Sequence, residues 1–197
     1  MRISPLPLLS TICLVSLVFS SNATQDDWKP LFDGKDLTGW VIMNDAAFTV
    51  TNGIIHLDKS TGWLRTERAY TNFVFEVEWR GLETNYNSGI FVRAGLEGKP
   101  HPTGAWQVNL KQSALGQILR GKTEVLPATT PPFPANEWVR FRIMAQGRRL
   151  TLDVNGKRAW EFDKLDADHG YIGIQAEGRP LDFRSLRVKE ITDSPSQ

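Results

Sequence analysis

The stretch NFVFEVEWR, residues 72–80, alternates between two kinds of side chain. Its odd-numbered positions from 73 to 79 are all large and apolar, whereas Glu76, Glu78 and Arg80 occupy even positions. Side chains of a β-strand point alternately to opposite faces of the sheet. The stretch is therefore predicted to be a strand that buries one face and presents carboxylates on the other.

The same period of two recurs along the chain. It predicts further strands at Gly89–Ala94, Ala105–Leu110, Trp138–Ala145, Leu150–Val154, Lys157–Phe162, Tyr171–Glu177 and Leu181–Ile191. Asn52-Gly53 and Asn155-Gly156 are strong signals for two-residue hairpin turns. Leu126–Pro134 contains four prolines, which excludes a central strand there. Many short strands without a long amphipathic helix predict an all-β sandwich of two antiparallel sheets.

The first 23 residues have the features of a secretory signal peptide. Arg2 is followed by the apolar run Leu6–Phe19 and by small residues at positions 21 and 23. We expect cleavage after Ala23, export to the periplasm or the extracellular space, and a single domain over residues 27–192. The one cysteine, Cys13, lies within this signal, so the mature chain has no disulfide and no thiolate. No membrane span is expected after cleavage.

Composition narrows the class of partner. The formal net charge is +1 and no basic stripe occurs, so nucleic acid is not an expected partner. Seven tryptophans are present in this short chain. Aromatic faces pack against the apolar faces of sugar rings, and they also fill sandwich cores.

Several motifs resemble one known family. WKPLFDGKDLTGW (28–40) is similar to the LFNGKDLSGW opening of the 3-keto-disaccharide hydrolase domain family. Further similar blocks follow in the same order: GWLRT (62–66), NSGIFVR (87–93), LDVNG (152–156), GIQ (173–175) and DFRSLR (182–187). The resemblance implies a concanavalin A-like jelly-roll sandwich with a concave side that faces sugar. It also implies an exported hydrolase, or an elimination and hydration enzyme, acting on glycosides already oxidised at C3.

Strand alternation puts six polar side chains on the polar faces of their strands. If these faces all point to the concave side, the six side chains are candidates for one site. They are Glu78, Arg93, Gln107, Asn109, Gln175 and Glu177. If these faces converge, Gly89 and Gly173 leave room for a ligand close to the sheet. A single β-bulge would turn a member of this set to the other face.

Roles for these residues follow from the implied chemistry. A base near C2 is needed, for which Glu177 and Glu78 are candidates, and Arg93 or Gln175 is a candidate to polarise the ketone. Trp63 is a candidate for stacking on a sugar or for the core, and alternation favours the core for Trp106. A plain ion pair between Glu78 and Arg93 is the alternative without chemistry.

The sequence departs from the family at its polar positions. Glu177 stands where many relatives have histidine, which fits either a replacement base or a loss of function. Relatives commonly carry an acid in the block that here reads Trp106-Gln107-Val108-Asn109, and an amide cannot take up a proton at neutral pH. A non-catalytic carbohydrate-binding domain using the same face is therefore the alternative function.

Metal ligands are not evident. His56, His101 and His169 lack paired ligand spacing, so neither a metal site nor a cofactor is predicted. By analogy with the sandwich class alone, Ca²⁺ is conceivable at Asp33-Gly34-Lys35-Asp36, where a plain turn is the other interpretation.

Overall fold

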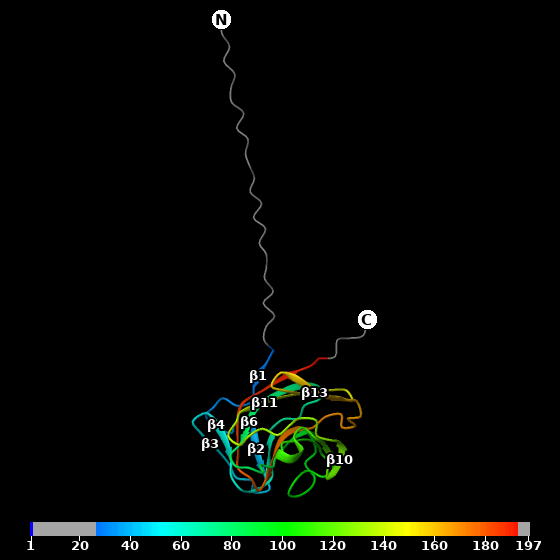
Figure 1. The fold of residues 1–197 in the computed structure, drawn as a ribbon. Helices are drawn as coiled ribbons and strands as arrows, with labels where there is room; N and C mark the ends of the chain where they lie inside the picture. Colours follow the sequence, from blue (N-terminus) through cyan, green and yellow to red (C-terminus); the bar gives the residue numbers. More distant parts are fainter. Residues whose placement is uncertain (2–26, 193–197) are drawn as a thin grey trace.

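The computed structural model describes Met1 and residues 27–192. Apart from Met1, the predicted signal peptide lies outside the described residues. Within the described range, no helix is long and apolar enough to cross a bilayer. The ends of this range lie close together, because the first strand, β1 (Lys29–Pro30), pairs with the last, β15 (Leu181–Glu190), as Figure 1 shows in blue and red.

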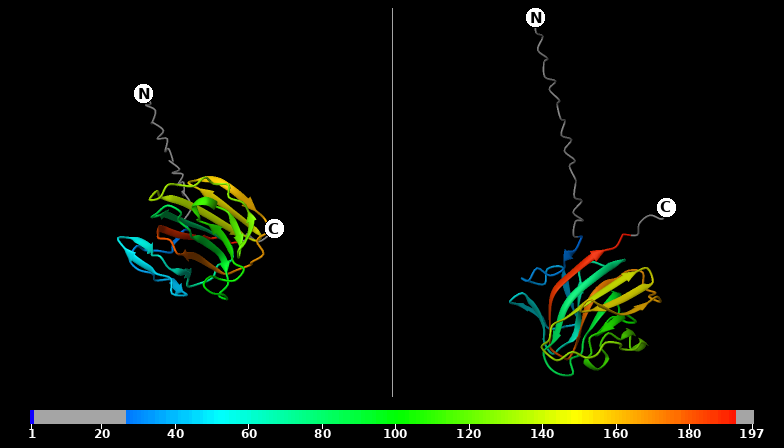
Figure 2. Two further views of the ribbon diagram at one scale, coloured as in Figure 1. Left: turned by 60° about the horizontal axis from the view of Figure 1, so that its bottom comes forward. Right: turned by 45° about the horizontal axis from the view of Figure 1, so that its top comes forward.

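Two antiparallel sheets make up the structure. The first sheet has eight strands, with β1 paired to β15 at one side of the path β13-β12-β11-β6-β15-β4-β3. The bounds of its other strands are β3 (Phe48–Thr51), β4 (Ile54–Leu57), β6 (Phe73–Gly81), β11 (Val139–Gln146), β12 (Arg149–Val154) and β13 (Lys157–Phe162). Strands β6 and β15 run side by side in its middle (Figure 2, right).

The second sheet has seven strands in the order β10-β9-β8-β7-β14-β5-β2. Its strands are β2 (Trp40–Met43), β5 (Thr61–Thr66), β7 (Gly89–Ala94), β8 (Trp106–Asn109), β9 (Ile118–Arg120), β10 (Thr123–Leu126) and β14 (Tyr171–Glu177). One short 3₁₀ helix, Gln112–Ala114, follows β8. The predicted sandwich of two antiparallel sheets is confirmed.

The hydrophobic core lies between the two sheets. The apolar positions 73, 75, 77 and 79 of β6 are all at most 1% exposed and belong to it. Positions 106 and 108 of β8 and positions 172, 174 and 176 of β14 face them from the second sheet. The period of two predicted from the sequence thus sets which side chains are buried, and it leaves the intervening polar residues on the outer faces.

Both predicted hairpins form. Asn52 and Gly53 have φ of 53° and 74°, and Asn155 and Gly156 have φ of 49° and 81°. Two successive positive φ angles define the type I′ turn that matches the twist of paired strands. The proline-rich segment begins where the edge strand β10 ends, as its exclusion from a central strand required.

Five strands were not predicted from the sequence, namely β1, β2, β5, β9 and β10. Each has only two to six residues, and none alternates cleanly. Two of them, β9 and β10, form the edge of the second sheet next to β8. Their position matters because this edge supplies one wall of the cavity described below.

Candidate functional site

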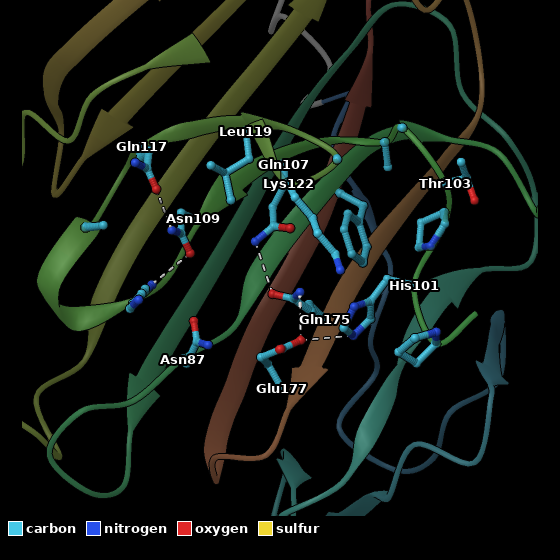
Figure 3. A pocket seen from close by; sticks show the side chains of 18 of the residues that line it. Asn87, His101, Thr103, Gln107, Asn109, Gln117, Leu119, Lys122, Gln175 and Glu177 are labelled. Atoms are coloured by element: carbon cyan, nitrogen blue, oxygen red, sulfur yellow. Dashed lines mark hydrogen bonds and ion pairs between the residues drawn. The ribbon is translucent and has the colours of Figure 1, made fainter. Parts of the chain in front are cut away.

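Four polar side chains meet on the outer face of the second sheet. On β8, residues 106 and 108 point into the core, so Gln107 and Asn109 point away from it. The same alternation on β14 turns Gln175 and Glu177 outward. All four line one cavity of about 610 Å³ (Figure 3). The predicted convergence is confirmed for these four residues.

Loops on either side of β8 raise the walls of the cavity. Residues 99–105 precede the strand, and Gln117, Leu119 and Lys122 follow it around the β9–β10 hairpin. A volume of this size lies within the range of about 300–1,000 Å³ typical of small-molecule sites. The lining mixes amides, cations and one carboxylate with apolar groups, which suits a ligand rich in hydroxyl groups.

A relay of hydrogen bonds crosses the cavity floor. The Nε2 of Gln107 donates to the Oε1 of Gln175 at 3.0 Å, and the Nε2 of Gln175 donates to the Oε2 of Glu177 at 3.1 Å (Figure 3). Both glutamines are less than 10% exposed. A carboxylate only accepts hydrogen bonds, so it fixes the direction of the whole relay. Glu177 itself is 39% exposed and can be reached from the cavity.

His101 holds the other side of Glu177. Its Nε2 lies 3.2 Å from the Oε2 of Glu177 and 3.0 Å from the backbone oxygen of Ala176. Both neighbours are acceptors, so Nε2 carries the hydrogen. Sequence reasoning noted His101 only as one of three scattered histidines. Its place between Pro100 and Pro102, shortly before β8, was the available signal for its nearness to the site.

A second relay leads away from the other amide. The Nδ2 of Asn109 donates to the Oε1 of Gln117 at 2.9 Å, and Gln117 in turn donates to Glu124. The Oδ1 of Asn109 accepts the backbone N–H of Lys111 at 3.2 Å. Each of the two amides on β8 is therefore linked through a glutamine to a carboxylate. Gln117 and Glu124 were missed because they belong to the edge that the sequence did not predict.

Glu78 does not belong to this site, and its predicted place there is wrong. It lies on β6 in the first sheet, where it accepts hydrogen bonds from Arg140 at 2.6 Å and Arg184 at 2.8 Å. Burial raises the pKa of Glu78, but the bonds from the two arginines outweigh it, so the pKa is lowered overall. Alternation gives the face of a residue on its own sheet, but it does not say which sheet a strand joins.

Arg93 is also placed elsewhere, contrary to prediction. It has φ of 49° at a register shift between β7 and β14, so a bulge turns its side chain away from the cavity. Its guanidinium is buried and donates to three backbone oxygens and a side-chain amide oxygen, namely those of Thr71, Gly147, Ala167 and Asn72. Burial lowers the pKa of Arg93. It ties loops together and forms no pair with Glu78.

The predictions for two tryptophans and two glycines had different outcomes. Trp63 lies on the cavity side of the sheet but is 1% exposed and packs edge-on against Phe91, so it is a buried residue rather than a stacking platform. Trp106 lies in the main core, as predicted. The space above Gly89 holds the Gln107 amide and that above Gly173 holds the Trp63 ring, so neither glycine leaves room for a ligand.

The Asp33–Asp36 loop forms turns. Asp33 accepts the backbone N–H of Lys35 at 2.9 Å, and Asp36 accepts that of Thr38 at 2.8 Å. Across the described residues, no group of three or more histidine, cysteine or acidic side chains is arranged to hold a metal ion. The loop thus has the plain-turn geometry that was the other interpretation of this segment.

Comparison with known families gives a match over most of the chain. The model for the 3-keto-alpha-glucoside-1,2-lyase-like domain matches residues 27–189. The chain belongs to this family. Its cavity lies on the outer face of the second sheet, where the Glu177 side chain is 39% exposed. No curated protein gave a significant match.

Solved structures similar to this lyase-like chain share its sandwich. One is a candidate glycosyl hydrolase from Parabacteroides distasonis, with a TM-score of 0.69, 20% identity, and coverage of 86% of this chain and 98% of that one. A carbohydrate-binding module from Bacillus subtilis has a TM-score of 0.66 and 12% identity, covering 77% and 96%. A Bacillus subtilis protein with a galectin-like fold has a TM-score of 0.67 and 13% identity, covering 83% and 94%. At these identities the similarity establishes the fold alone.

Proposed function

We propose that this protein is an exported enzyme that cleaves 3-keto-glycosides, including 3-keto-disaccharides, by elimination between C1 and C2 of the oxidised sugar. The observation that carries the proposal is Glu177, a carboxylate at the edge of the cavity that is held by Gln175 and His101. Family membership supports the substrate class. Export rests on the signal-like sequence at residues 1–23.

The chemistry begins with the C3 ketone, which makes the proton on C2 acidic. A base removes this proton, and the electron pair of the C2–H bond delocalises onto the ketone oxygen as an enolate. When the ketone re-forms, C1 and C2 become doubly bonded and the bond from C1 to the glycosidic oxygen breaks. That oxygen takes up a proton and leaves as an alcohol. Water can then add to the unsaturated sugar.

Glu177 fits the role of the base. A general base must lie within about 3 Å of the proton that it takes, so it has to be exposed to the ligand and held in place. Glu177 is exposed on its cavity side, while two hydrogen bonds from Gln175 and His101 restrict its other side. His101 and Glu177 are in contact, so the pair can pass a proton on to the leaving oxygen.

Gln107 and Asn109 serve as binding groups in this scheme. An amide both donates and accepts, which suits sugar hydroxyl groups, but it does not act as a base. Their presence also favours the second candidate function, a carbohydrate-binding domain that uses the same cavity without turnover. Gln107 and Asn109 stand where relatives commonly carry an acid.

Incubation of the mature protein with a 3-keto-disaccharide, followed by NMR, separates the two functions. We expect free monosaccharide to appear, and the Glu177→Gln variant to bind the substrate but release about 100-fold less product or none. Glu161→Gln, which alters a carboxylate paired with Arg149 on the first sheet, is the matched control and should keep full activity. Saturable binding by the wild type without any release would support the binding domain and refute the enzyme.

A further inference from the structure

Three lysines line the cavity, namely Lys99, Lys111 and Lys122. Lys122 lies at the turn between β9 and β10, and its side chain extends into the cavity toward His101 and Gln175 (Figure 3). We propose that Lys122 is a catalytic residue whose ammonium group binds the C3 ketone oxygen and stabilises the enolate. This inference rests on the function proposed above and names the group that the elimination needs opposite Glu177.

The turn that carries Lys122 is fixed to the cavity wall. The N–H of Gly121 donates to the backbone oxygen of Ala105 at 2.8 Å, which joins the turn to the residue before β8. Gly121 has φ of 60°, and a Cβ there would lie 3.5 Å from the Cα of Gly104, so the two loops touch closely. The backbone of Lys122 is thus anchored beside the cavity, although its side chain is exposed.

The nearby arginines, Arg120 and Arg93, are already engaged in other contacts. Arg120, two residues earlier, pairs with Asp166 and lies over the Trp106 ring at 4.8 Å. Arg93 is buried among backbone oxygens away from the cavity. Among the residues that the structure describes, Lys122 has no such hydrogen-bonding or ion-pair partner, so its ammonium group is available for a ligand.

The elimination requires a positive charge close to the C3 oxygen of the substrate. When Glu177 removes the C2 proton, negative charge develops on the C3 oxygen, two bonds away from C2. Gln107 and Gln175 are neutral and are already tied into the relay. A cation that donates a hydrogen bond to the enolate oxygen lowers the barrier more than it strengthens substrate binding, because the charge is present only in the later state. Lys122 keeps its proton throughout, so the step remains balanced.

A lysine on the other sheet provides the control. Lys157 begins β13 in the first sheet and is exposed there. We expect Lys122→Gln to lower kcat for release of the leaving group by about 100-fold while KM changes less than about threefold. Lys122→Arg should recover part of the loss, and Lys157→Gln should stay within about threefold of the wild type in kcat.

Exchange of the C2 proton for deuterium measures the proton-removal step separately from release of the leaving group. With methyl 3-keto-glucoside in D₂O, deuterium uptake at C2 should slow in Lys122→Gln by a factor similar to that for kcat. Equal kcat values for Lys122→Gln and Lys157→Gln, or a rise in KM alone, would overturn the role of Lys122 and leave the proposed function standing. Absence of release by the wild type would instead refute the proposed function, and the role of Lys122 with it.

Discussion

The amide of Gln107 crosses over Gly89 to reach Gln175, with 3.0 Å between the Nε2 of Gln107 and the Oε1 of Gln175. Strand β7 lies between the strands of these two residues. A Cβ on residue 89 would lie 2.2 Å from the Nε2 of Gln107. The relay that orients Glu177 therefore depends on Gly89, because a glycine has no Cβ that would block the Gln107 amide. Gly89 itself does not touch the carboxylate.

Gly89→Ala tests this dependence. The added methyl group meets the far end of a flexible side chain, so we expect Gln107 to swing aside and the fold to remain. Ligand affinity, measured by calorimetry with a 3-keto-disaccharide and the Glu177→Gln background, should fall by about tenfold, as expected for loss of about 1.4 kcal/mol of hydrogen bonding. Unchanged affinity would show that the relay does not organise the ligand site.

Gly173→Ala should act on stability instead. Its Cβ would lie 2.6 Å from the ring of Trp63, which is itself fully buried against Phe91. Overpacking of this kind costs about 1–3 kcal/mol of unfolding free energy, measurable by urea denaturation. Gly95→Ala is the control, because nothing lies within 4 Å of its added methyl group. Equal stability of the two variants would contradict the packing seen around Trp63.

Arg93→Met should destabilise the protein without a specific effect on the ligand site. The change removes the charged donor that bonds to the carbonyl oxygens of Thr71, Gly147 and Ala167. We expect a loss of about 1.5–3 kcal/mol in the free energy of unfolding, because hydrogen bonds that involve a charged group contribute about this much. At a temperature where the variant is folded, its KM should match that of the wild type. A rise in KM without any loss of stability would show that Arg93 takes part in ligand binding.

Stability should depend on pH through Glu78. Its pKa in the folded protein is lowered, mainly by the bonds from Arg140 and Arg184 against the effect of burial. A group with a lowered folded pKa stabilises the protein above its unfolded pKa, about 4.3 for glutamate, and that contribution disappears as the pH falls through the folded pKa. The unfolding free energy should therefore drop below about pH 4.3.

Glu78→Gln identifies the group responsible. The variant should be less stable than the wild type at pH 7, and its free energy of unfolding should change less between pH 5 and about pH 3, because one linked proton is removed. Urea denaturation at a series of pH values measures both quantities. Parallel pH profiles for the two proteins would show that Glu78 does not contribute to the acid sensitivity.

The order of apolar and polar residues alone determined the all-β class of this fold and the buried face of its long strands. A period of two over residues 72–80 and its repetitions identify the core face of each long strand, because neighbouring side chains must point to opposite sides of a sheet. The two Asn-Gly turns predict their hairpins through local conformational preference. The same alternation correctly brought Gln107, Asn109, Gln175 and Glu177 to one outer face.

Only the tertiary structure decided which polar faces meet. Glu78 and Glu177 have similar local sequence patterns, but their strands belong to different sheets, and sheet membership depends on pairing between distant segments. Arg93 lies outside the site because one bulge turns its side chain away. Such a change of register is not visible in the periodicity of the sequence. His101 and Lys122 line the site but belong to loops, where side chains follow no period. Their positions are fixed by tertiary contacts such as the hydrogen bond between Gly121 and Ala105.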